Sequence, residues 1–139
     1  MLNNKEKAFL RTSQVARMAT ADNRGRPHVV PICYVVDGDD FYTPIDEKPK
    51  TVAPRHLKRV RNIGMNPYVS IAVDRYDDNW KRLAYILIMG KARLLTRGLR
   101  HRKAVTMLKK KYFQYRSMVI QNRPVIHIRV GKFTIWGNL

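Results

Sequence analysis

The chain has 139 residues, 45% of them hydrophobic, and a single cysteine, Cys33. This length suits one domain spanning residues 1–139, and one cysteine excludes an internal disulfide framework. No apolar run approaches the roughly 20 residues that cross a bilayer, and the first residues lack the apolar core of a secretory signal, so we expect a cytoplasmic protein that is not inserted in a membrane.

The net charge of +18 is unevenly distributed along the chain. All ten Asp and Glu residues precede residue 79, while residues 79–139 carry fifteen Lys and Arg. A half-chain without carboxylates cannot neutralise itself and attracts anions. Two interpretations stay open: a solubilising surface, or a surface for a polyanion such as an anionic cofactor tail, a nucleic acid or an acidic partner.

The first half of the chain predicts a short helix followed by a β meander. We expect the helix at residues 5–13, with Phe9 on its buried side, and strands at residues 15–21, 27–36 and 41–43. Turn residues separate the three strands, namely Asp22-Asn23-Arg24-Gly25 and Asp37-Gly38-Asp39.

The second half predicts two further helices and three further strands. The apolar spacing places one helix at residues 54–65 and another from Thr96, as its N-cap, to about residue 113, burying Leu99. Strands are expected at residues 68–76, 83–95 and 125–130, with residues 131–139 as a possible continuation.

These elements favour a mainly β fold: a six-stranded antiparallel barrel with flanking helices. A doubly wound parallel sheet is the alternative, but it needs a crossover helix between successive strands. The first three strands are too close in sequence for such crossovers.

Metal and nucleophile chemistry find little support. His28, His56, His101 and His127 are widely scattered, without the ligand spacing of zinc sites, so we expect no metal. Cys33 lies in an apolar strand without a neighbouring cation, and no serine lies in a Gly-x-Ser-x-Gly context. Glycine-rich phosphate loops are also absent. No catalytic side chain is therefore identified.

A basic segment after the third strand is the strongest functional signal. Thr43 offers a hydroxyl where that strand ends, and Lys48 and Lys50 flank Pro49 on a stiffened loop. The following helix carries Arg55, Lys58, Arg59 and Arg61, whose mutual repulsion a bound anion would relieve. This pattern predicts a phosphate-binding region, although an ordinary solvated loop is the plainer alternative for Lys48 and Lys50.

Pro31 interrupts an apolar strand and removes a donor from the ladder. The position is therefore an edge, a bulge or a place that another group approaches. In a cofactor site, Val30 and Ile32 would offer backbone groups to a flat ring beside it; otherwise the strand simply bends at a barrel corner.

In their order, these residues resemble the pyridoxamine 5′-phosphate oxidase-like split β-barrel family, in its branch of FMN- or coenzyme F-420-dependent oxidoreductases. The matching segments are residues 16–22 (ARMATAD), 25–31 (GRPHVVP), 46–50 (DEKPK), 61–63 (RNI), 66–70 (NPYVS), 74–80 (DRYDDNW) and 85–95. The resemblance weakens over residues 96–122. It implies a homodimer with two cofactor sites at the subunit interface.

The resemblance also implies roles for individual residues. Val30, Pro31 and Ile32 would line the ring, and Thr43, Lys48 and Lys50 would meet phosphate or ribityl oxygens. The helix would contribute Arg55, Arg59, Arg61 and Asn62, and Trp80 and Trp136 are candidate walls supplied across the dimer. Pyridoxamine phosphate oxidation itself is disfavoured, because the chain lacks the longer C-terminal substrate region of that enzyme.

The predicted function is thus an oxidoreductase that passes hydride between a bound flavin or deazaflavin and a small substrate. Tyr42, Tyr76 or Tyr85 could donate a proton near the ring, although packing is the plainer role for all three. One rival is a nucleic-acid-binding module, because residues 101–111 are basic, with Tyr112, Phe113 and Tyr115 nearby. A cofactor carrier without turnover is the other rival.

Overall fold

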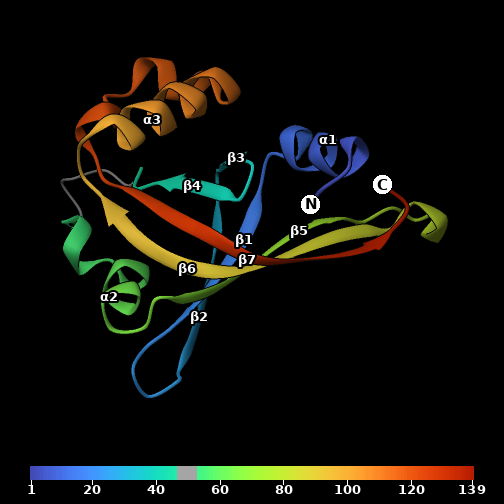
Figure 1. Cartoon of the computed structure of the whole chain (residues 1–139), viewed down its shortest axis with the longest axis horizontal. Helices are drawn as coiled ribbons and strands as arrows, with labels where there is room; N and C mark the ends of the chain where they lie inside the picture. The colour runs from blue at the N-terminus through green and yellow to red at the C-terminus, as the bar shows by residue number, and fades with distance from the viewer. Residues whose placement is uncertain (47–52) are drawn as a thin grey trace.

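The computed structural model describes residues 1–46 and 53–139. Seven strands, three α-helices and four short 3-10 turns follow one another within those residues (Figure 1). In chain order they are α1 (Asn4–Thr12), β1 (Ala16–Ala21), β2 (Pro27–Ile32), β3 (Val35–Asp37), β4 (Asp40–Pro44), η1 (Pro54–His56), α2 (Lys58–Met65), β5 (Tyr68–Arg75), η2 (Trp80–Arg82), β6 (Ala84–Leu95), α3 (Leu99–Lys111), η3 (Phe113–Ser117), η4 (Ile120–Asn122) and β7 (Val125–Gly137).

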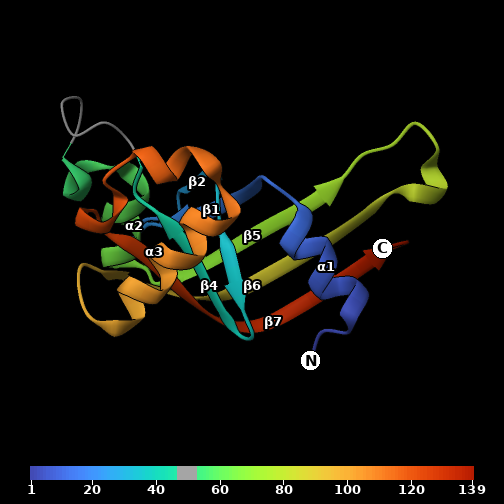
Figure 2. The same ribbon diagram turned by 90° about the horizontal axis from the view of Figure 1, so that it is seen from above.

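The strands form one antiparallel sheet in the order β2-β1-β5-β6-β7-β4-β3. This confirms the mainly β, antiparallel fold with flanking helices. The long β6 and β7 pair along nearly their whole length and cross the molecule, with α2 near one end and η2 at the other (Figures 1 and 2). The two edge strands, β2 and β3, are separated by only two residues, so the curled sheet is split where they meet.

The sheet has seven strands, whereas six were predicted, because the expected strand at residues 27–36 divides in two. Tyr112 explains the division. Its hydroxyl accepts from the backbone N–H of Tyr34 at 2.9 Å and lies 3.1 Å from the carbonyl oxygen of Tyr34, so these backbone groups bond to a side chain. The side chain of Tyr34 is itself fully buried and stacks on Phe41.

Two hydrophobic clusters fill the structure. The larger lies inside the curled sheet and includes Phe9 and Leu10 from α1, whose N-terminus carries a capping box between Asn3 and Glu6. The smaller lies between α3 and strands β3, β4 and β7, around Tyr42 and Leu108. The helix α3 therefore covers one end of the sheet, as Figure 1 shows.

The last helix begins later than predicted. Gly98, with φ of 101°, precedes it as N-cap, and Thr96 provides no cap. The buried side chains His101, Ala104, Val105 and Leu108 follow the i, i+3, i+4, i+7 spacing of one helix face, and Leu99, on the opposite face, is 75% exposed, contrary to the prediction. The His101 ring lies 2.7 Å from the carbonyl oxygen of Arg123, a tertiary contact that sequence spacing does not reveal.

The helix predicted at residues 54–65 is broken at Leu57, whose extended backbone separates η1 from α2. No helix within the described residues is long and apolar enough to cross a membrane. The final strand runs to Gly137, so residues 131–137 do continue it.

The predicted turn between the first two strands forms around Asp22, which is 2% exposed. Its Oδ1 accepts from the backbone N–H groups of Arg24 and Arg26, and Gly25 takes the required positive φ of 77°. The backbone hydrogen bond from Arg26, assisted by the Arg26 side chain, lowers the pKa of Asp22 to about 2, against desolvation by burial, which opposes the shift.

A depressed carboxylate pKa makes stability depend on pH in acid. The ionised Asp22 stabilises the fold above its unfolded pKa of 3.8, and this contribution is lost as the pH falls from about 4 to about 2. We expect Asp22→Asn to lower Tm at pH 7 and to lose less further stability between pH 4 and pH 2 than the wild type. Thermal unfolding followed across that range measures both; parallel curves for the two proteins would refute the assignment.

Candidate functional site

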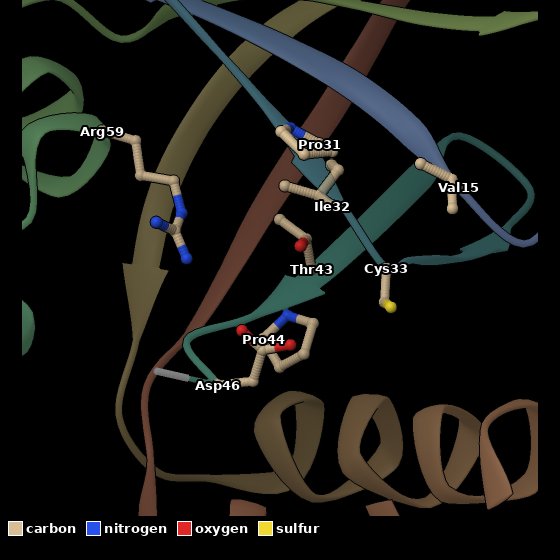
Figure 3. A pocket seen from close by; sticks show the side chains of 8 residues that line it. All are labelled: Val15, Pro31, Ile32, Cys33, Thr43, Pro44, Asp46 and Arg59. Carbon is tan, nitrogen blue, oxygen red and sulfur yellow. The ribbon is translucent and has the colours of Figure 1, made fainter. Parts of the chain in front are cut away.

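A cavity of about 160 Å³ lies at the split in the sheet. Figure 3 shows the side chains around it, which come from β2, β4, the segments that follow these two strands, the residue before β1, and α2. The lining residues are Val15, Pro31, Ile32, Cys33, Thr43, Pro44, Asp46 and Arg59. Four of the residues predicted to bind a cofactor therefore lie together at this cavity: Pro31, Ile32, Thr43 and Arg59.

Pro31 lies where an edge strand can tolerate it. The strand β2 is an edge strand that pairs only with β1, where Pro31 is opposite Arg17. Edge strands are where a sheet tolerates a proline. Of the three interpretations of Pro31, the edge position is confirmed, and the proline ring also lines the cavity. Its neighbour Ile32 is 7% exposed and lies between the cavity and the core.

Arg59 reaches the cavity from the first turn of α2 and is only 5% exposed. The helix is anchored to the sheet by Asn62, whose Nδ2 donates to Oγ1 of Thr20 at 3.0 Å. In Figure 3 the Arg59 guanidinium is directed toward the space between β2 and β4. A buried guanidinium on an anchored helix is a preorganised donor for an anion.

Thr43 supplies the most specific indication of a ligand. The residue is 1% exposed, and its Oγ1 has no hydrogen-bond partner within residues 1–46 and 53–139. A buried hydroxyl without a partner costs about 1–3 kcal/mol. A phosphate or ribityl oxygen in the cavity would satisfy it, so this chain's residues fit the polar end of a flavin-type cofactor.

Sequence reasoning missed an acidic residue at the same cavity. The carboxylate of Asp46 accepts a short hydrogen bond from the Tyr115 hydroxyl, and Arg123 donates to the Asp46 carbonyl oxygen at 2.9 Å. Burial, and after it this hydrogen bond, raises the pKa of Tyr115. The phenol therefore stays protonated and donates a hydrogen bond to the Asp46 carboxylate. These contacts tie the end of the β4 segment to the region after α3, and no sequence spacing predicts them.

The other predicted site residues lie away from the cavity or outside the described residues. The Val30 side chain packs against the core, and Asn62 is fully buried against Thr20. Arg55 and Arg61 are exposed and do not line the cavity. Lys48 and Lys50 fall in residues 47–52, outside the described residues.

The two tryptophans are also remote within one chain. Trp80 belongs to η2 and Trp136 to the end of β7, at the end of the sheet far from α2 (Figure 2). Trp136 stacks on Tyr85 across the β6–β7 pair, with ring centroids 5.3 Å apart. Trp80 is 72% exposed. Any contact between these rings and the cavity requires a second copy of the chain.

The three tyrosines considered as proton donors do not line the cavity. The hydroxyl of Tyr42 accepts from Arg100 at 2.8 Å, its ring stacks on His127, and the residue is 1% exposed, as a packing role predicts. Tyr76 is exposed, and Tyr85 is the partner of Trp136.

The basic helix α3 is partly neutralised by the strands beneath it. Lys103 forms an ion pair with Asp37 at 2.7 Å, and Arg100 forms one with Asp40 at 3.3 Å. Lys111 turns inward, with Nζ 3.8 Å from the Tyr34 ring centroid. Its apolar side packs in the smaller cluster, so the amphipathic interpretation accounts for this helix without a nucleic acid.

The family model of pyridoxamine 5′-phosphate oxidase matches residues 2–137. The chain belongs to the pyridoxamine 5′-phosphate oxidase family. This confirms the resemblance drawn from the ordered segments of the sequence and agrees with the split antiparallel sheet. No curated protein matches the chain significantly.

Solved structures share the fold over nearly the whole chain. HupZ of Group A Streptococcus is 25% identical, with a TM-score of 0.71 and coverage of 98% of this chain and 100% of its own. HutZ of Vibrio cholerae, described as a heme storage protein, is 15% identical, with a TM-score of 0.72 and coverage of 98% and 94%. An F-420 reductase is 18% identical, with a TM-score of 0.66 and coverage of 96% and 98%.

Members of this fold thus include proteins named for deazaflavin chemistry and for heme storage. Within the described residues of this chain, no group of three or more His, Cys, Asp or Glu side chains could hold a metal ion. The polar groups at the split are the Thr43 hydroxyl and the Arg59 guanidinium, which suit a phosphate, together with the Asp46 carboxylate and the Cys33 thiol.

Proposed function

We propose that this member of the pyridoxamine 5′-phosphate oxidase family is a flavin- or deazaflavin-dependent oxidoreductase. The observation that carries the proposal is the cavity at the split, where the buried Arg59 and the partnerless Thr43 hydroxyl converge beside the Pro31 edge. When bound, FMN or coenzyme F-420 supplies the hydride chemistry for a small substrate. The chain's own residues bind and orient the cofactor and exclude water.

Each lining residue has a distinct task in this proposal. Arg59 meets the phosphate, and the Thr43 hydroxyl donates to a phosphate or ribityl oxygen. Pro31 and Ile32, at the end of the edge strand β2, present an apolar edge to the ring. Lys48 and Lys50, in the segment that follows β4, add cations to the same phosphate.

The cavity formed by the described residues is smaller than a complete ligand pocket. Pockets that enclose ligands of drug size have volumes of about 300–1,000 Å³, whereas this cavity has about 160 Å³. It suits the phosphate end, with the ring extending past its mouth. We therefore propose a homodimer, in which the exposed Trp80 or Trp136 of a second copy covers the ring.

The uneven charge favours the deazaflavin over FMN. Coenzyme F-420 carries a phosphodiester and an oligoglutamate tail, and the acid-free stretch of residues 79–139 gives this protein a positive field that attracts such a tail. Affinity for F-420 should then fall with added salt and with removal of the tail. Equal affinity under both treatments would remove the preference for F-420.

The deciding experiment is an absorbance titration of the purified protein with FMN and, separately, with F-420. We expect a spectral shift with at least one of them and co-elution on gel filtration at the mass of a dimer. In the Lys48→Ala, Lys50→Ala variant the Kd should rise at least about tenfold, because each charge-assisted contact contributes about 1.5–3 kcal/mol. If the protein binds neither FMN nor F-420, the proposed function is overturned.

A further inference from the structure

A second and larger hollow, of about 610 Å³, lies on the face of the sheet that points away from the main core. Strands β1, β5, β6 and β7 contribute to it, and it shares no lining residue with the cavity at the split. Its residues are Ala19, Thr20, Ala21, Pro27, Tyr68, Val69, Ser70, Met89, Gly90, Lys91, Arg129, Val130, Gly131 and Lys132.

A β-bulge creates the concavity. The β6–β7 register pairs Met89 with Lys132 but Gly90 with Val130, so Gly131 is the extra residue and β7 bends there. Ala19, a short outward side chain, is paired with the exposed Ser70 on the neighbouring strand, and Ser70 is paired in turn with the exposed Met89. Short side chains therefore form the base of the hollow, and its surface is largely apolar. Its volume falls in the range of ligand pockets.

Cations border the hollow, and none of the described residues that line it is acidic. Lys91, Arg129 and Lys132 belong to its lining. Lys91 is held with Nζ 5.2 Å from the Tyr68 ring centroid, and Arg129 is held by Asp40 at 3.2 Å, so two of the three charges have defined positions.

The carboxylate of Asp40 does not neutralise this border. Asp40 also forms an ion pair with Arg100 at 3.3 Å and accepts from His127 at 2.7 Å, so one negative charge serves several donors. The positive charge of Arg129, Lys91 and Lys132 is therefore in excess beside an apolar surface. An apolar ligand without charge would leave that excess uncompensated.

We propose that this hollow is a second ligand site, for an amphiphilic anion. The ligand's apolar ring or chain would lie on Met89, Tyr68 and the alanines, and its carboxylate, phosphate or sulfonate would meet Arg129 and Lys91. This inference goes beyond the oxidoreductase proposal and does not depend on it, because the two cavities have separate linings.

The test compares two fluorescent probes with the same apolar body. One is 8-anilino-1-naphthalenesulfonate, which carries an anion, and the other is the neutral N-phenyl-1-naphthylamine. We expect the full-length protein to bind the sulfonate at least about tenfold more tightly, as one charge-assisted contact allows. The variant Lys91→Gln, Arg129→Gln should lose this preference while its affinity for the neutral probe changes less than about twofold.

A matched control variant, Lys81→Gln, Lys110→Gln, has the same net charge but alters exposed lysines outside the hollow. It should keep the preference for the sulfonate. If both double variants lose affinity equally, the effect is one of net charge and the site is refuted. Equal affinities of the wild type for the two probes would also refute it.

A third variant, Ser70→Trp, fills the hollow from an exposed strand position. It should abolish binding of both probes without changing the sedimentation coefficient, whereas saturation with FMN or F-420 should leave sulfonate binding unchanged. If Ser70→Trp instead converts a dimer to a monomer, the hollow is a subunit interface and the ligand site is overturned. Displacement of the sulfonate by the cofactor would overturn the separate site but not the oxidoreductase proposal.

Discussion

Replacing Arg59 with glutamine is expected to raise the Kd for the flavin or deazaflavin by about ten- to a hundredfold. The side chain lines the cavity at the split and is only 5% exposed, so its charge acts in a partly desolvated setting. Loss of one charge-assisted hydrogen bond there removes about 1.5–3 kcal/mol of binding free energy. The measurement is the absorbance or fluorescence titration used for the wild type.

The matched control for this experiment is Arg61→Gln. Arg61 lies two residues further along the same helix, is exposed and does not line the cavity, so the affinity should change less than threefold, or about 0.6 kcal/mol. Arg59→Lys should recover part of the loss, because a lysine keeps the charge but not the planar fork of donors. Thermal unfolding checks that the Arg59→Gln variant is folded. If the folded variant binds the cofactor as tightly as the wild type, the phosphate does not lie at this cavity.

The substitution Gly90→Ala is expected to destabilise the fold, because strands β6 and β7 approach each other closely at this position. A Cβ at position 90 would lie 2.3 Å from the backbone oxygen of Arg129 and 2.8 Å from a methyl carbon of Ile128. Because a backbone oxygen in a paired strand cannot move aside freely, the bulge must distort. We expect a loss of about 1–3 kcal/mol or more in the free energy of unfolding, which corresponds to a Tm lower by roughly 3–10 °C.

Gly131, the other glycine of the same bulge, provides the control. A Cβ there would meet only the Met89 carbonyl oxygen, at 3.6 Å, an ordinary contact distance. Gly131→Ala should therefore change the free energy of unfolding by less than about 0.5 kcal/mol. If the two variants have equal Tm values in thermal unfolding, the close approach of β7 does not exclude a Cβ at position 90.

The sequence predicted correctly those turns and strands that are formed by interactions between residues close together in the chain. The turn at Asp22 was predicted because a carboxylate acceptor and a glycine of positive φ act within four residues of one another. The hairpin around Gly38 was predicted because Asp-Gly favours such a turn, and Gly38 does take a positive φ. The alternation of residues 68–76 predicted β5 nearly to its ends. The Pro31 edge was among the expected interpretations, because proline removes a donor wherever it occurs.

The predictions that failed depend on contacts between distant segments. Tyr112 divides the strand at Tyr34 from 78 residues away, and the buried ring of His101 contacts the carbonyl oxygen of Arg123 from another segment. The prediction of the cofactor-binding arginines was limited for the same reason, because contacts between distant segments decide which of them reach the cavity. Charge alone selected Arg55, Arg59 and Arg61 together, but only Arg59 lies at the cavity.

The sequence by itself determined the mainly antiparallel fold, the family and the basic character of the region after β4, because these follow from spacing, residue type and order along the chain. Only the tertiary structure decided which cations reach the split, that Asp46 lies beside them, and that a second hollow exists on the outer face of the sheet. The physical reason is the direction of side chains. One residue of offset in a strand turns a side chain from the interior to solvent, and packing between distant segments sets that offset.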